Sequence, residues 1–230
     1  MFVAVFLIPA CTRAGALPPP GQAHVADGAG VQTPAAPEPA ISAQALEVSR
    51  IAERNGDKTF LMVDKARGEI ILFENDKPSF SGPALTGASM GDRIPPKVLT
   101  FYNSHPLTTD QKVTPAGRFT VTPELDPEYG HVWTINEIQG KDWDIAIHRV
   151  YLGTPSEHRE ARIHSANPDD RHITFGCINV EPATIQVLAR KLPRKGKVPL
   201  YVLPRDQSMT AALFPRHAIA TAAAAARSTP

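Results

Sequence analysis

Prolines interrupt the middle of this chain so often that long helices are excluded there. The 230 residues include 23 prolines, about twice the usual share of roughly 5%. Proline lacks a backbone N–H and fixes φ, so it breaks a helix interior but is tolerated at strand edges and in loops. Several lie between short apolar runs, at positions 78, 83, 95, 96, 106, 115, 123 and 127. The sequence therefore predicts a mostly β domain built from short strands.

The runs between these prolines are rich in β-branched and aromatic residues, which is typical of strands. Residues 60–63 and 70–73 flank a turn that ends at Gly68, and together they predict a hairpin. Further strands are expected at 84–86, 118–121, 132–135, 143–147 and 198–203.

One or two helices are expected beside these strands. Residues 41–54 predict a short helix that Asn55-Gly56 ends. A second begins near Pro182, whose fixed φ suits a first helical position. Its apolar stripe, spaced at i, i+3, i+4 and i+7, consists of Ile185, Leu188, Ala189 and Leu192.

Both ends of the chain differ from the middle. Residues 2–8 form an apolar run of the length found in a secretory signal, and Ile8-Pro9-Ala10-Cys11 resembles the lipobox of bacterial lipoproteins. Residues 12–40 and 206–230, rich in Ala and Pro, bury too little apolar surface to offset their ordering entropy. We therefore expect an exported protein of the periplasm or cell envelope, with a working domain at 41–205 and a lipid anchor on Cys11 as an open alternative.

Composition excludes several classes of function. Lys and Arg total 24 against 23 Asp and Glu, which leaves a net charge of +1. This charge is too small to create a field that would hold nucleic acid. No apolar run approaches the roughly 18 residues of a membrane-spanning helix. The two cysteines, Cys11 and Cys177, can form neither a disulfide scaffold nor a Cys-only zinc site.

Cys177 is the strongest candidate for a chemically reactive residue. Cys11 is either cleaved off or lipidated, so Cys177 is left as an unpaired thiol in an exported protein, which suggests a reactive group. Gly176 before it allows a substrate carbonyl to approach the backbone. The helix that follows is expected to aim its N-terminal amides toward the thiol and favour the thiolate.

A free thiol of pKa about 8.5 is mostly protonated at neutral pH, so the site needs a histidine. His148 ends the apolar run 145–147, and a strand terminus holds an imidazole rigidly, which favours it as the general base. His164 is the second candidate, in a polar insert. The other upstream histidines considered within reach of the cysteine are His131, His158 and His172.

The segment Thr174-x-Gly176-Cys177-Ile178-Asn179 resembles the Ser/Thr-x-Gly-Cys-x-Arg/Asn motif of the L,D-transpeptidase (YkuD-type) family. Ala146-Ile147-His148 is similar to the strand that ends in the family's catalytic histidine. Residues 114–119, Thr-Pro-Ala-Gly-Arg-Phe, match a further family element. Phe175 departs from the family pattern, which usually has histidine at that position.

This resemblance implies a β-sandwich that acts on peptidoglycan stem peptides without metal or cofactor. Cys177 would attack the stem-peptide carbonyl, His148 would transfer the proton, and backbone amides around Gly176 would hold the oxyanion. An amine of another stem peptide or of an outer-membrane lipoprotein would resolve the thioester. The residues expected to bind substrate are Thr174, Asn179, Arg149 and Tyr151.

Three other functions stay open. Water in place of the amine would make the protein an L,D-carboxypeptidase. A metal-binding domain would use Cys177 with histidines 148, 158, 164 or 172, although these spacings match no standard zinc pattern. A catalytically silent, wall-binding lipoprotein would account for Phe175 in place of the motif histidine.

Overall fold

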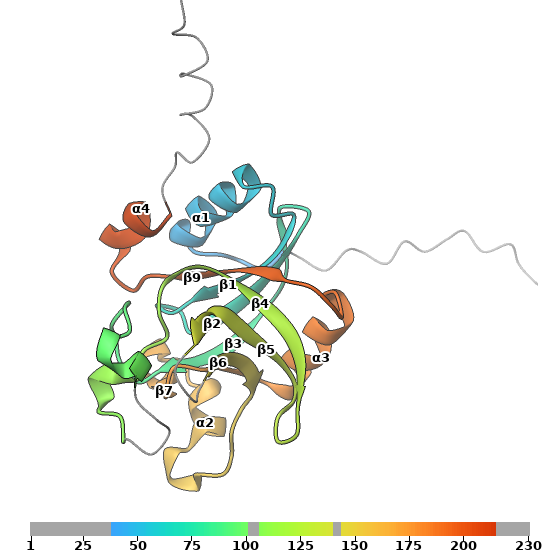
Figure 1. Cartoon of the computed structure of the whole chain (residues 1–230). Helices are drawn as coiled ribbons and strands as arrows, with labels where there is room; N and C mark the ends of the chain where they lie inside the picture. The colour runs from blue at the N-terminus through green and yellow to red at the C-terminus, as the bar shows by residue number, and fades with distance from the viewer. Residues whose placement is uncertain (1–37, 101–105, 140–143, 215–230) are drawn as a thin grey trace, which may run out of the picture. The chain divides into compact units, whose positions relative to one another are not determined.

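The computed structural model describes residues 38–100, 106–139 and 144–214. Nine strands in this part form one mixed sheet (Figure 1). The predicted signal sequence with Cys11, the tether up to residue 37, and Trp143 lie outside the described residues. The prediction of a mostly β domain is confirmed.

The sheet returns on itself. Its strand order is β2-β1-β9-β4-β5-β6-β8-β3-β7, and β2 also pairs with β3, so the two halves enclose a common apolar core as in a β-sandwich. The strands are β1 (Thr59–Asp64), β2 (Glu69–Glu74), β3 (Lys77–Gly87), β4 (Gly117–Asp126), β5 (Gly130–Gln139), β6 (Asp144–Arg149), β7 (His172–Thr174), β8 (Ile178–Val180) and β9 (Val198–Leu203).

Four α-helices accompany the sheet in the described ranges, more than the one or two expected. They are α1 (Ala43–Arg54), α2 (Arg159–Ile163), α3 (Pro182–Lys191) and α4 (Thr210–Leu213). The sequence predicts α1 and α3, whereas α2 and α4, with 5 and 4 residues, are too short to show a helical period. None of the helices described is long and apolar enough to cross a membrane.

Strand β1 is apolar on both faces because both are covered. Leu61 and Val63 point into the core between the two halves of the sheet. Phe60 and Met62 point to the opposite face and pack with the apolar residues of α1. Figure 1 shows α1 next to β1. This arrangement explains why the run has no polar alternation.

The chain remains ordered beyond residue 205, where the sequence predicts a structureless tail. Phe214 is buried against the α1 side of the sheet, and Gln44 Nε2 donates to Thr210 Oγ1 at 2.9 Å. The burial of Phe214 thus extends the domain to residue 214. The alanine-rich composition around this residue gave no signal of it in the sequence. The residues beyond 214 lie outside the described part.

Prolines also lie inside strands, not only at edges and loops as expected. Pro83 in β3 is the last residue that pairs with β2, and Ala84 is the first that pairs with β8. The missing N–H therefore coincides with the point where β3 changes partner.

Strands β6 and β8 are parallel neighbours, and they bring the predicted catalytic residues together. Ile147 pairs with Ile178, and His148 pairs with Asn179. Cys177 directly precedes Ile178, so it lies at the start of β8, next to the part of this strand that pairs with β6.

Candidate functional site

Cys177 lies in the short loop that leads into β8. Its Sγ faces the backbone oxygen of Asp144 at 3.9 Å, and the residue is half-buried. Helix α3 begins only after β8 ends, and three strand residues add roughly 10 Å. The expectation that the helix amides face the thiol is therefore wrong.

The hydrogen-bond partners of His148 define its tautomer. Nδ1 lies 2.8 Å from the backbone oxygen of Arg149, which can only accept, so Nδ1 carries the proton. Nε2 lies 3.0 Å from Nδ2 of Asn179 and accepts from it. The imidazole is therefore neutral, with its basic lone pair on Nε2.

Behind Asn179 lies a buried arginine. Nη1 of Arg159 donates to Asn179 Oδ1 at 2.9 Å, and Nε of Arg159 donates to Glu157 Oε2 at 2.7 Å. Arg159 is 7% exposed and Asn179 is fully buried. A continuous set of polar contacts thus joins His148 through Asn179 and Arg159 to Glu157.

Thiol and imidazole are both neutral in this arrangement. Burial lowers the pKa of His148 to about 4, and the charge of Arg159 acts in the same direction. Burial raises the pKa of the Cys177 thiol, although the Ala146 amide and Arg159 oppose that rise. The sequence predicts that the helix amides and a histidine favour the thiolate, whereas in the structure burial of the pair outweighs the favourable charges.

The lowered pKa of His148 predicts acid sensitivity of the fold. The unfolded chain binds the imidazole proton at about pH 6.5 and the folded chain only near pH 4, so stability is lost as the pH falls through this window. The free energy of unfolding should decrease by roughly 3 kcal/mol from this group. Urea unfolding at pH 7, 5 and 4 should show a smaller decrease for His148→Gln. An equal decrease in both proteins would contradict the assignment.

The Cys177 loop is held by two hydroxyl groups. Thr114 Oγ1 donates to Gly176 O at 2.7 Å, and Thr174 Oγ1 donates to Cys177 O at 2.6 Å. Gly176 has φ +134°, and a Cβ there would lie 2.8 Å from the Val113 oxygen. Glycine is therefore required both for backbone geometry and for space.

The predicted roles of Gly176 and Thr174 differ from what the loop displays. The Gly176 N–H donates to Thr174 Oγ1 at 3.1 Å, so it is already paired. Thr174 is buried, and the hydrogen bonds of its hydroxyl lie within the loop. Both residues therefore shape the peptide groups next to Cys177.

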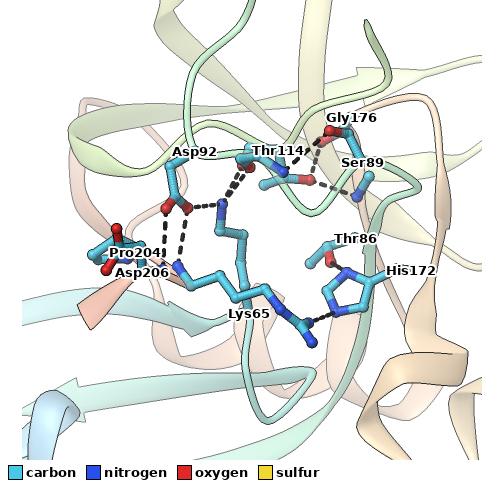
Figure 2. A network of polar contacts seen from close by, with 12 residues as sticks. Lys65, Thr86, Ser89, Asp92, Thr114, His172, Gly176, Pro204 and Asp206 are labelled. Atoms are coloured by element: carbon cyan, nitrogen blue, oxygen red, sulfur yellow. Dashed lines mark hydrogen bonds and ion pairs between the residues drawn. The ribbon is translucent and has the colours of Figure 1, made fainter. Parts of the chain in front are cut away.

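A buried ion pair supports Thr114 from behind. Lys65 Nζ contacts Asp92 Oδ1 at 2.5 Å and donates to Thr114 O at 2.9 Å (Figure 2). Both charged side chains are less than 10% exposed, at 4% and 7%. Since a buried ion pair is costly to separate, it fixes the segment that holds Gly176.

The hairpin turn between β4 and β5 covers the imidazole. The Tyr129 ring lies 4.2 Å from the His148 ring. Asp126 Oδ1 accepts from the N–H of Glu128 and of Tyr129, both at 2.8 Å. Nη2 of the exposed Arg149 donates to Glu128 O at 2.7 Å, so this predicted substrate residue holds the turn in place.

The other two predicted substrate residues also lie within this group. Asn179 is buried between His148 and Arg159 and is closed to solvent. The Tyr151 ring lies 6.2 Å from Tyr129, and the Arg159 guanidinium lies 5.4 Å over it. Phe175, at the position of the motif histidine, is 53% exposed and carries Lys112 Nζ at 4.0 Å over its ring.

The remaining histidines lie away from the thiol loop or have other partners. His164 is exposed and pairs with Glu181 at 3.5 Å. His172 accepts from Arg205 on Nε2 and contacts Thr86 on Nδ1 (Figure 2). His131 lies on β5 and His158 precedes α2. In the described ranges, no three His, Cys, Asp or Glu side chains are grouped to hold a metal.

A cavity of about 280 Å³ lies beside the segment that supports the loop. Pro115 and Ala116, which follow Thr114, form part of its wall together with Phe119. Three charged residues, Asp92, Arg93 and Glu137, also line it. The recess thus combines apolar side chains with one cation and two carboxylates, of which Asp92 is paired with Lys65.

Sequence reasoning missed three residues of this site. Arg159 lies in the polar insert, where its charge predicts a solvent-exposed side chain. Thr114 belongs to a recognised motif, but its contact with Gly176 spans 62 residues. Tyr129 follows the Asp126-Pro127 turn signal, which could have placed it at a hairpin tip but not over His148.

Residues 58–200 of the chain match the YkuD family, the L,D-transpeptidase catalytic domain. No curated protein matches. Similar solved structures include the catalytic domain of the E. faecium L,D-transpeptidase, with 18% identity, 64% of this chain and 98% of that chain covered, and a TM-score of 0.41. An L,D-transpeptidase from Mycobacterium smegmatis has 14% identity, 63% and 58% coverage and a TM-score of 0.37.

A further similar structure is that of the Ldtfm-avibactam carbamoyl enzyme. It has 17% identity and a TM-score of 0.38, and the match covers 64% of this chain. The chain spans about half of that protein, 49% of its length.

Proposed function

The chain belongs to the L,D-transpeptidase catalytic domain family, and from this premise we propose that Cys177 is the nucleophile of an acyl transfer on peptidoglycan stem peptides. One observation carries the proposal. Cys177 immediately precedes β8, whose Asn179 pairs with His148 on the adjacent parallel strand β6, and the imidazole keeps its basic lone pair on Nε2.

The first step is proton transfer from Cys177 Sγ to Nε2 of His148. Strand spacings put the two Cα atoms about 8 Å apart, a gap that a thiol and an imidazole can bridge. Nε2 takes the thiol proton in place of the hydrogen bond that it accepts from Asn179. Nδ1 keeps its hydrogen bond to the Arg149 carbonyl, which stabilises the imidazolium that forms.

The sulfur attacks the carbonyl carbon of the third stem residue, and the C–N bond to the terminal D-alanine breaks. His148 returns its proton to the leaving amine, which leaves a thioester on Cys177. An amine of a second stem peptide or of a lipoprotein resolves the thioester and gives up a proton to His148. Attack by water instead gives a carboxypeptidase.

The Cys177 N–H is the proposed oxyanion donor. Gly176 O points to the buried Thr114 hydroxyl, and in a planar trans peptide the N–H points the opposite way. The Cys177 amide therefore faces away from Thr114, on the side from which a substrate carbonyl approaches. The Gly176 N–H, which Thr174 already binds, serves the loop instead.

The cavity beside Pro115 is proposed to receive part of the stem peptide. Its apolar side chains and its opposite charges, Arg93 and Glu137, match a peptide that carries both amino and carboxylate groups. The chain is proposed to act in the periplasm or cell envelope, because residues 2–8 predict a secretory signal. Lipidation at Cys11 would anchor it to a membrane.

The function is tested with a purified tetrapeptide stem as donor. Release of D-alanine together with a cross-linked dimer, both read by mass spectrometry, is the expected result. Release of D-alanine with only the tripeptide would identify a carboxypeptidase. If no D-alanine is released and the protein gains no mass with a carbapenem, the proposal is overturned. The catalytically silent, wall-binding protein is then the function that remains.

A further inference from the structure

Arg159 has no contact with the thiol loop in the described part of the chain, yet it is buried at the site. It extends from α2 to the amide of Asn179 on β8 and is held in place by Glu157. Burying a guanidinium costs free energy unless its donors are paired. The burial of Arg159 next to Asn179 is therefore expected to serve the site.

The reason lies in the two ends of the Asn179 amide. Arginine can only donate hydrogen bonds, so an Asn179 amide with Nδ2 toward the guanidinium would place two donors against each other. Oδ1 therefore faces Arg159 at 2.9 Å, and Nδ2 necessarily faces His148 Nε2 at 3.0 Å. A donor opposite Nε2 disfavours a proton on that nitrogen.

We propose that Arg159 is a positioning residue of this site, which keeps Nε2 of His148 an unprotonated acceptor by fixing the orientation of the Asn179 amide. Its permanent charge acts in the same sense, because it repels an imidazolium. The inference rests on the proposed function only for its catalytic consequence.

In the described hydrogen bonds, no other group around His148 fixes the Asn179 amide. The charge of Arg149, on the same strand, also lowers the pKa of His148, but this side chain is exposed and donates to Glu128 O. Asp126, at the turn that carries Tyr129, would favour an imidazolium. The Tyr129 ring covers one face of the imidazole and excludes water. The Cys177 thiol is neutral because burial raises its pKa.

The catalytic consequence concerns the second half of the proton transfer. An imidazolium that Arg159 and Asn179 destabilise is a stronger acid, so it protonates the departing amine more readily. Arg159 would thus favour the neutral base at rest and rapid return of the proton after attack.

The experiment titrates the His148 imidazole by NMR in three variants of the full chain. Arg159→Met should raise the pKa of His148 by roughly 1–2 units, because both the charge and the amide lock are lost. Arg159→Lys keeps a donor and a charge and should restore most of the low value. Asn179→Asp keeps the partner of Arg159 but turns an oxygen toward Nε2, so the pKa should rise above 6.5.

Arg162→Met is the matched control on the same helix. Arg162 donates to Glu157 O and Asp170 O, so its loss perturbs α2 without touching Asn179. The pKa of His148 should stay near 4 in this variant. An unchanged pKa in both Arg159→Met and Asn179→Asp, or an equal shift in Arg162→Met, would overturn the proposal. This readout needs no turnover, so it is independent of whether the protein proves to be an enzyme.

Discussion

Cys177→Ala should abolish both D-alanine release from a tetrapeptide stem and the mass increase with a carbapenem. Removal of an activated nucleophile leaves no atom to form the thioester, so the rate should fall by at least about 10⁴-fold. The fold should persist, because the described hydrogen bonds of Sγ are with backbone groups, namely a long contact of 3.9 Å with Asp144 O and a contact with the Ala146 amide. The free energy of unfolding should therefore change by less than about 1 kcal/mol.

The second cysteine provides the matched control. Cys11 is the other thiol of the chain, and Cys11→Ser should react with the carbapenem at the wild-type rate. Cys177→Ser is the stricter variant, because it keeps a nucleophilic atom whose pKa is far higher, and it should also show no adduct. Turnover by Cys177→Ala that matches the wild type would refute the thioester mechanism.

The parts of the fold that the sequence predicts are those in which a local pattern reflects burial. Residues 60–63 alternate between the core and the face covered by α1. Both environments are buried, so both favour β-branched and aromatic residues. The stripe of α3 likewise follows from its one buried face. Strands β7 and β8, with 3 residues each, are defined by their neighbours and leave no pattern of their own.

For the site, the sequence identifies the candidate groups but not their protonation. Glycine before a cysteine and a histidine at a strand end are local signals, and the structure places Cys177 just before β8 and His148 on the adjacent strand β6. The pKa of each depends on burial and on Arg159, which lies 20 residues from Asn179 in the chain. Only the fold supplies that information, and for this reason the sequence could not show that the thiol and the imidazole are both neutral.

A neutral pair changes the pH dependence expected of the enzyme. A thiolate–imidazolium pair would lose activity once the imidazolium deprotonates. A neutral pair instead needs His148 unprotonated, so acylation should stay constant from neutral pH down to about pH 4, where His148 gains its proton. Iodoacetamide, which needs the thiolate, should by contrast react ever faster as the pH rises, since burial raises the pKa of Cys177.

His148→Gln should lower the rate of acylation by about 10²–10⁴-fold, the usual contribution of a general base. Glutamine retains a side chain that can pair with Asn179 and fill the space under Tyr129, so the loss reports on proton transfer more than on packing. Acylation by a carbapenem, followed by intact mass across pH 4 to 9, measures both the rate and its pH dependence. The decrease in acylation rate near pH 4, the acid limb of the pH profile, should be absent in this variant, because it has no imidazole to protonate.

His164→Gln tests the alternative base. His164 is exposed and pairs with Glu181, on the outside of the insert, and no described contact joins it to Cys177. Its replacement should leave the rate and the acid limb unchanged. If His164→Gln removes the limb while His148→Gln keeps it, the insert supplies the base, and the contact between His148 and Asn179 is structural. That result would also remove the catalytic role of Arg159, because the guanidinium acts on proton transfer only through His148.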